Sequence, residues 1–288
     1  MSKTQSNVTS NSPQSYLNAT GKIPHNMTND YMFRAILQKN TNVLRGLIGS
    51  ILHIPPKEIT DIYIKNPILL GASLKEKAFV LDIHVCINNH TIINLEMQVI
   101  NEHNWPERSL SYLCHIFRQL TQGQNYCNIK PVIHIGFLDF QPFENNLEFF
   151  AMYKLLNVRN HKIYSDKFAL GVIDLTHIDL ATDEDKTYHI DHWAKLFKAT
   201  TWEDIKMIAT ENEYMEEAIQ TLYECNADEI IREQCIARAE EIASKNYYIQ
   251  ALAERDATLA EKDAELEATH AELAQLRAQL AELKKAQS

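Results

Sequence analysis

Asp82, Glu96 and Gln98 are the side chains of this 288-residue sequence whose types and spacing best suit a hydrolytic reaction. Two carboxylates held close together can bind a hard divalent cation such as Mg²⁺ or Mn²⁺, which lowers the pKa of a bound water and polarises a phosphoryl oxygen. We expect Asp82 and Glu96 to be metal ligands, with the backbone carbonyl of Met97 as a third. The amide of Gln98 could orient the attacking water, because it both donates and accepts hydrogen bonds.

A β-hairpin should bring the two carboxylates together. Residues 79–87 and 91–100 are strand-like apolar segments, and residues 88–90 can turn the chain between them. Because side chains alternate faces along a strand, Asp82 and Glu96 both point away from the apolar faces. Pairing the residues that flank the turn and counting back along both strands places Asp82 opposite Glu96, with Cβ atoms roughly 4.5–5.5 Å apart.

The same spacing also fits an ordinary surface hairpin. Antiparallel sheets commonly have one apolar and one solvated face, and single acidic residues are frequent on the solvated face. The two interpretations differ physically, because opposed carboxylates on a half-buried sheet repel each other unless a cation lies between them.

The order of several short segments resembles a known nuclease family. The pattern Asp-x13-Glu-x-Gln, from Asp82 to Gln98, resembles the PD-(D/E)XK nuclease superfamily, where lysine usually stands in place of Gln98. More closely, residues 29 to about 140 resemble the bacterial recombination-promoting nuclease and transposase family of that superfamily. The segments are Asn29-Asp30-Tyr31-Met32-Phe33, Lys77, Asp82, Glu96-Met97-Gln98, Arg108, Tyr112, Gly123-Gln124-Asn125-Tyr126 and the strand-like run 131–140.

The resemblance implies a restriction-endonuclease-like α/β fold, with a mixed central sheet flanked by helices, and a metal-dependent DNA endonuclease. It assigns Asp82 and Glu96 to the metal, Gln98 to the position of the catalytic lysine, and Asp30 to an acid that approaches the metal from the first helix. Asp30 fits equally well as a carboxylate in a helix first turn, where the helix dipole favours it. Because Gln98 is neutral, the metal, Lys77 or Arg108 must supply the missing positive charge.

A helix from Trp105 to about Gln122 is expected to carry the DNA contacts. Its Arg108 and Tyr112 share a face that could meet a phosphate backbone, although a solvated helix face is the alternative. Two further cations, Lys75 and Arg118, lie near the same site in the sequence. The net charge of −10 argues against tight nonspecific DNA binding, because DNA-binding proteins usually carry a basic stripe.

Composition is that of a soluble globular protein, at 45% hydrophobic and 23% charged residues. No apolar run approaches the ~18 residues of a membrane span, and the polar N-terminus lacks the apolar core of a secretory signal. Five scattered cysteines without CxxC spacing are typical of free thiols and predict a cytoplasmic location. His84 and Cys86 lie on the face of Asp82, but no second pair completes a zinc site.

The chain is expected to have three parts: a disordered polar tail (1–24), the nuclease-like domain with a helical C-terminal part (25–240), and a long helix (241–288). Within the domain we expect a helix capped by Thr28, and helical structure again from Thr187. Trp193, Leu196 and Phe197 are predicted core residues. Other expected elements are a helix at 42–52 and strand regions at 59–70, 130–140, 148–155 and 168–174.

Leucines recur every seven residues in the last segment, which has neither Gly nor Pro and is rich in good helix formers. If the leucines occupy position d of a heptad, the residues at position a are polar, namely Asp256, Asp263, His270 and Arg277. If they occupy position a, position d is apolar only in the last two heptads, at Leu276 and Leu283. We predict a weak coiled coil that forms a homodimer, the alternative being a single exposed helix. The leucines are Leu252, Leu259, Leu266, Leu273 and Leu280.

Two classes of function are consistent with these observations. The first is a metal-dependent DNA endonuclease associated with recombination or mobile elements. The second is a catalytically inactive nuclease-like protein that binds DNA or acts as an oligomeric interaction protein, as the acidic balance and the missing lysine would suggest. Nothing in the sequence separates RNA from DNA as the substrate.

Overall fold

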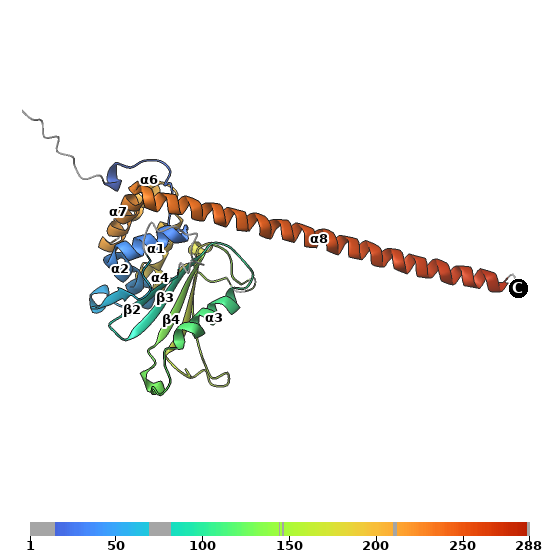
Figure 1. The fold of residues 1–288 in the computed structure, drawn as a ribbon, viewed down its shortest axis with the longest axis horizontal. Coiled ribbons are helices and arrows are strands. Elements are labelled where there is room, and N and C mark those ends of the chain that lie inside the picture. The colour runs from blue at the N-terminus through green and yellow to red at the C-terminus, as the bar shows by residue number, and fades with distance from the viewer. Residues whose placement is uncertain (1–14, 69–81, 144, 146, 210–211, 287–288) are drawn as a thin grey trace, which may run out of the picture. The chain divides into compact units, whose positions relative to one another are not determined.

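The computed structural model describes residues 15–68, 82–143, 145, 147–209 and 212–286 (Figure 1). A six-stranded sheet in the order β1-β2-β3-β4-β6-β5 forms the centre. Strands β1, β2 and β3 are antiparallel neighbours, β3, β4 and β6 run parallel, and β5 closes the sheet antiparallel to β6. The strands are β1 (Ile62–Ile64), β2 (Ile83–Ile87), β3 (Thr91–Gln98), β4 (Val132–Leu138), β5 (Phe150–Lys154) and β6 (Phe168–Asp174).

Helices flank this sheet, and the predicted restriction-endonuclease-like α/β fold is confirmed. The helix α3 forms the crossover between the parallel strands β3 and β4, as parallel pairing requires. The helices are α1 (Asp30–Lys39), α2 (Thr41–Leu52), α3 (Trp105–Phe117), α4 (Asp183–Thr187), α5 (Ile190–Lys198), α6 (Trp202–Ile208), α7 (Glu213–Ala227) and α8 (Glu229–Ala286).

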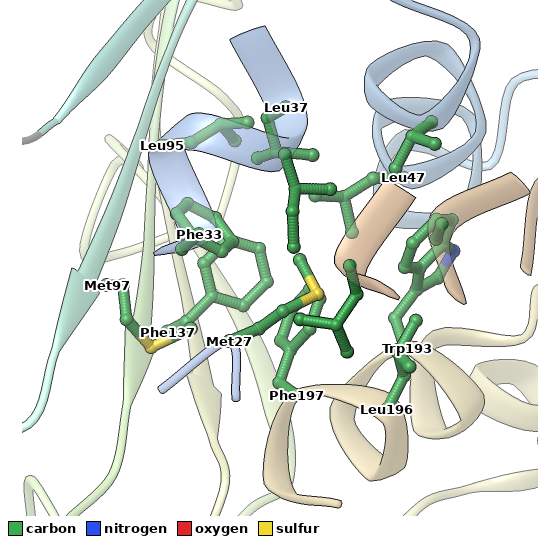
Figure 2. Close-up of a cluster of buried hydrophobic side chains, with 14 of the residues drawn as sticks. Met27, Phe33, Leu37, Leu47, Leu95, Met97, Phe137, Trp193, Leu196 and Phe197 are labelled. Atoms are coloured by element: carbon green, nitrogen blue, oxygen red, sulfur yellow. The ribbon is translucent and has the colours of Figure 1, made fainter. Parts of the chain in front are cut away.

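The larger core packs helices α1, α2, α5 and α7 against one face of the sheet (Figure 2). Phe33 of α1 lies 5.4 Å from Phe137 of β4 and 5.5 Å from Phe197 of α5, between ring centroids. The predicted core residues Trp193, Leu196 and Phe197 are fully buried. This packing fixes the sheet against α1, which carries Asp30.

The other face of the sheet is covered by α3 over β4 and β6. Gly136 of β4 allows this packing, because a Cβ there would lie 2.1 Å from the Trp105 ring. Trp105 begins α3, so the close contact at Gly136 fixes the helix end that carries Arg108. Over β2 and β3, this face holds Asp82 and Glu96.

The predicted hairpin is confirmed, including its register. Ile87 pairs with Thr91 and Ile83 with Leu95, which leaves Asp82 one step beyond the strand and opposite Glu96. The part of the first segment before Asp82, residues 79–81, lies outside the described residues.

Three predicted boundaries were wrong for local reasons. Asn29, not Thr28, caps α1, because its Oδ1 accepts from the Met32 N–H at 3.2 Å while Thr28 donates to Asn26. Helix α3 ends at Phe117 rather than Gln122, since the Gln119 side chain instead pairs with the Lys130 backbone at 3.0 and 3.1 Å.

The strand expected at 59–70 is only three residues long. It ends before Asn66, whose side chain bonds to the backbone of Asp82 and His84. Residues 69 and 70 lie outside the described residues.

The N-terminal segment is more ordered than expected from residue 15 onward. Tyr16 and Ile23 are buried, and Lys22 forms a β-bridge with Thr201. The prediction of disorder is therefore wrong for residues 15–24, because Tyr16 and Ile23 pack into the core.

By contacts, the chain divides into two compact units, Met1–Ala239 and Glu240–Ser288. The second unit consists of the later part of α8, a helix of 58 residues, which confirms the predicted long helix. The five heptad leucines are 42–57% exposed, so the apolar stripe is available to a partner. Among the described residues, no helix is long and apolar enough to cross a membrane.

Candidate active site

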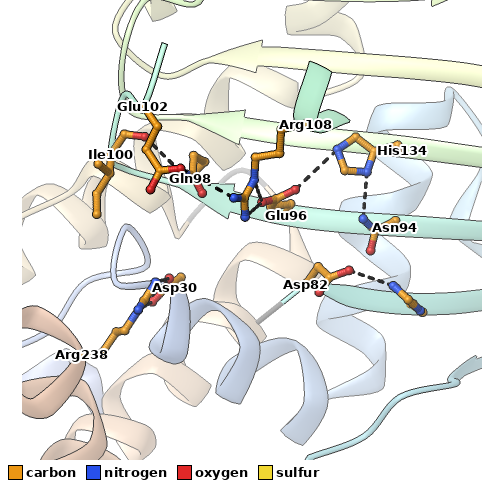
Figure 3. Close-up of polar contacts among 11 residues, drawn as sticks. Asp30, Asp82, Asn94, Glu96, Gln98, Ile100, Glu102, Arg108, His134 and Arg238 are labelled. Atoms are coloured by element: carbon orange, nitrogen blue, oxygen red, sulfur yellow. Dashed lines mark hydrogen bonds and ion pairs between the residues drawn. The ribbon is translucent and has the colours of Figure 1, made fainter. Parts of the chain in front are cut away.

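Asp82 and Glu96 form a buried pair of carboxylates on the face of the sheet shared with α3 (Figure 3). As whole residues they are 4% and 5% exposed. One oxygen of each, Asp82 Oδ1 and Glu96 Oε2, has no hydrogen-bond partner among the described residues. Buried acceptors without partners are costly, so an unpartnered oxygen on each acid favours a bound cation over an ordinary surface hairpin.

The other oxygens of both acids are occupied. His84 Nε2 lies 2.8 Å from Asp82 Oδ2, and Arg108 donates to Glu96 Oε1 from Nε at 2.9 Å and from Nη2 at 2.8 Å. Burial raises the pKa of Glu96; the charge and hydrogen bonds of Arg108 oppose this, whereas the charges of Asp82 and Asp30 add to it. A divalent cation would relieve the repulsion between the two acids.

Arg34 of α1 fixes the backbone at Asp82. Its fully buried guanidinium donates to the carbonyl oxygens of Asp82 and Asn66. Asn66 also donates to the Asp82 carbonyl at 3.1 Å and accepts from the His84 N–H at 2.8 Å. Burial lowers the pKa of Arg34 to about 10 against the opposing charge of Asp82, so the side chain stays cationic at neutral pH.

Gln98 lies beside Glu96 on β3, as its spacing predicted (Figure 3). Its side-chain Nε2 donates to the carbonyl of Ile100 at 3.0 Å. This bond uses one amide N–H and holds the side chain at the end of β3, close to the carboxylate pair.

Asp30 is the first residue of α1, but it contacts neither Asp82 nor Glu96 by any hydrogen bond or ion pair between described residues. Instead, Arg238 of α8 holds both oxygens of Asp30: Nε lies 2.8 Å from Oδ1 and Nη2 lies 2.6 Å from Oδ2 (Figure 3). Asn29 donates to the Cys235 carbonyl at 2.9 Å, which adds a second tie between α1 and α8.

We expect Arg238→Met to destabilise the protein by about 3–5 kcal/mol, because it leaves the buried Asp30 carboxylate without its cation. Burial raises the pKa of the Cys235 thiol to about 12, so this thiol should be inert in the native protein. The loss of stability would be measured by thermal unfolding and by the rate of Cys235 alkylation, because the thiol reacts only when the native structure opens. Arg255→Met, an exposed change further along α8, is the control; equal stability of the two variants would contradict the prediction.

The described residues that were predicted to contact DNA do not form one surface in the structure. Arg108 sits over the Tyr112 ring, 5.2 Å from its centroid, and points to Glu96 rather than outward. Arg118 is exposed just after the far end of α3, about 15 Å along the helix axis from Arg108. Lys75 and Lys77 lie outside the described residues.

Four residues of this site were not predicted from the sequence: Arg34, Asn66, His134 and Arg238. His134 on β4 is fully buried, and its Nε2 lies 3.6 Å from Glu96 Oε2. Burial lowers the pKa of His134 to about 4, so the ring is neutral at physiological pH. A polar residue on the predicted strand 130–140 was an available signal for His134, but nothing in the sequence indicated Arg238.

The two carboxylates suit a divalent cation held partly by water and substrate oxygens. No cluster of three or more His, Cys, Asp or Glu side chains that could hold a metal occurs in the part of the chain that the structure describes. Hard cations such as Mg²⁺ are commonly bound by only one or two carboxylates together with waters and phosphate oxygens. The unpartnered oxygens of Asp82 and Glu96 meet that requirement.

Comparison with protein families identifies the chain. The model of the PD-(D/E)XK nuclease family transposases matches residues 27–251, more than half of the sequence. The chain belongs to this family. The resemblance was expected over residues 29 to about 140, and more weakly up to about 200; the match extends it into α8 and includes both Asp30 and Arg238.

Membership of the PD-(D/E)XK nuclease family transposases supports a nuclease role connected with mobile elements and implies DNA as a partner. No curated protein and no solved structure matches the chain.

Proposed function

We propose that this chain is a divalent-metal-dependent DNA endonuclease that hydrolyses phosphodiester bonds. The observation that carries the proposal is the buried pair Asp82 and Glu96, each with one unpartnered oxygen, in a member of a nuclease family. These two side chains would hold Mg²⁺ or Mn²⁺, together with the Met97 carbonyl. The bound ion would activate a water and polarise the scissile phosphate.

Gln98 orients the attacking water in this proposal. Its Nε2 is engaged by the Ile100 carbonyl, which leaves the amide oxygen to accept an O–H from water. A neutral amide adds no positive charge to the transition state, so that charge must come from another residue.

Among the residues that the structure describes, Arg108 is the cation best situated to supply the missing charge. Its side chain is 29% exposed, whereas that of Glu96 is 6% exposed, so the guanidinium can reach a phosphate at the surface. A substrate phosphate would compete with Glu96 for Arg108, since both are anions that the guanidinium binds through paired N–H groups. We also propose a catalytic role for Lys77, in addition to that of Arg108. Lys75, Tyr112 and Arg118 are proposed to bind DNA, and Asp30 to act near the metal.

Calorimetry tests the metal site without requiring activity. Mn²⁺ titrated into the full-length protein should give a heat of binding that saturates as the site fills, and Asp82→Asn should abolish most of that heat. Asp179→Asn, the same chemical change at an exposed position, should leave binding unchanged. If the wild-type protein does not bind Mn²⁺ or Mg²⁺, the catalytically inactive interaction protein becomes the better account.

The C-terminal helix would bring two nuclease domains together for cutting both strands of a duplex. Leu273→Glu with Leu280→Glu should convert a dimer to a monomer, because charge placed on the apolar stripe opposes helix pairing. The double variant should still nick DNA but produce fewer double-strand breaks per nick. Sedimentation velocity and plasmid cleavage measure the two effects.

The matched control for the helix experiment is Gln275→Glu with Ala278→Glu, on the same exposed helix but off the stripe. A wild-type protein that stays monomeric at tens of micromolar would contradict the proposed dimer.

A further inference from the structure

Two buried polar atoms face each other beside the carboxylate pair, and both lack a hydrogen-bond partner. His134 Nε2 on β4 lies 3.6 Å from Glu96 Oε2 on β3 (Figure 3). Neither atom has another partner among the described residues. Because a hydrogen bond of this kind requires about 3.0 Å, the two atoms are near each other but not bonded.

Asn94 decides which nitrogen of His134 carries the proton. The Asn94 side-chain Nδ2 lies 2.8 Å from His134 Nδ1. With the Asn94 amide nitrogen toward the ring, Nδ1 is the acceptor, because an amide nitrogen only donates; in a neutral ring the proton is then on Nε2. The unpartnered Nε2 is therefore a donor, and the unpartnered Glu96 Oε2 is an acceptor.

The strand register and the packing of α3 keep these groups in place. Asn94 is paired with His134 across the parallel strands β3 and β4, and Glu96 is paired with Gly136. The Trp105 ring lies against Gly136, with its centroid 5.7 Å from that of His134. The histidine thus lies between the Asn94 amide and the Trp105 ring.

On the basis of the proposed nuclease function, we propose that His134 is a positioning residue that holds Glu96 when Arg108 turns to the substrate phosphate. With Arg108 bonded to Oε1, the carboxylate stays about 0.6 Å beyond a hydrogen bond to His134. Once Arg108 leaves, a small rotation of the carboxylate brings Oε2 to the Nε2–H. Because Oε2 has two lone pairs, it can accept from Nε2–H and still face the metal. The bond then keeps Glu96 oriented, the role that hydrogen bonds to ligating carboxylates have in other metal sites.

The decisive variants are His134→Leu, which removes the donor, and His134→Gln, whose amide N–H can replace it. His134→Leu should raise the Mn²⁺ concentration for half-maximal cleavage, and the dissociation constant of Mn²⁺, by roughly 10–100-fold. His134→Gln should stay closer to the wild-type values.

The matched control for these variants is Ile135→Val, a volume loss at the next residue on the opposite face of β4. It should lower stability without changing the Mn²⁺ requirement. A His134→Leu protein with a wild-type Mn²⁺ requirement would overturn the proposal, as would equal shifts in all three variants.

The tautomer can be tested without metal or DNA. In the ¹⁵N NMR spectrum of the full-length protein at neutral pH, His134 should have a protonated Nε2 and an unprotonated Nδ1. The opposite tautomer would overturn the proposal even if cleavage occurs. A wild-type protein that neither binds Mn²⁺ nor cleaves DNA would instead refute the nuclease function, and the positioning role with it.

Discussion

Asp82→Asn should reduce metal-dependent DNA cleavage by about 1000-fold or more while leaving the fold intact. The change removes the charge of a metal ligand but keeps the size of the side chain and its hydrogen bond to His84. A bound metal supplies several kcal/mol of transition-state stabilisation, and each 1.36 kcal/mol is worth about tenfold in rate. Initial rates of plasmid nicking at saturating Mn²⁺, beside melting temperatures, would measure the loss.

The control for the Asp82 variant is again Asp179→Asn, at an exposed carboxylate away from the site. Its cleavage rate should match that of the wild-type protein. If Asp82→Asn cleaves DNA within about tenfold of the wild-type rate, Asp82 is not a metal ligand, because losing the charge of a ligand should slow cleavage by much more than tenfold.

Arg34→Met should destabilise the protein and release the backbone at Asp82. It removes a fully buried cation and leaves the carbonyl oxygens of Asp82 and Asn66 without that donor. An unsatisfied buried polar group costs about 1–3 kcal/mol, so the loss should be about 3 kcal/mol in total. Arg34→Lys should recover part of it, because one donor and the charge remain. Denaturant unfolding measures the stability of each variant.

Activity separates the role of Arg34 from stability alone. Arg45 of α2 also donates to a carbonyl, that of Ile59 at 3.0 Å, but it does not contact Asp82. Arg45→Met should therefore lose stability and keep cleavage at a temperature where it is folded. Arg34→Met should lose both, because the backbone at Asp82 is released. Equal cleavage by the two folded variants would contradict the positioning of Asp82 by Arg34.

The part of the site that could be predicted from sequence is the part set by local rules. The length of one turn and the alternation of side chains along a strand were sufficient to place Asp82 opposite Glu96, and the ladder confirms that register. Gln98 followed from the same alternation, since it lies two residues beyond Glu96 on β3.

The residues that surround the acids depend on contacts between distant segments. Arg238 lies 208 residues from Asp30, and neither sequence spacing nor helix periodicity relates them. Arg108 was expected to meet DNA or to supply charge at the site, but its bond to Glu96 was not predicted; it depends on how α3 is held at Gly136. Arg34 was hidden for another reason: a buried arginine that binds only carbonyl groups leaves no pattern of opposite charges in the sequence.

The central claim is that the carboxylate pair makes this protein a metal-dependent nuclease, and plasmid cleavage tests it most directly. Purified full-length protein would be incubated with supercoiled and linear duplex DNA, and with RNA, in Mg²⁺, Mn²⁺ or EDTA, beside Asp82→Asn. We predict nicking of duplex DNA with either metal, none in EDTA, and none with the variant. DNA left intact with both metals, or cut equally well in EDTA, would contradict the claim.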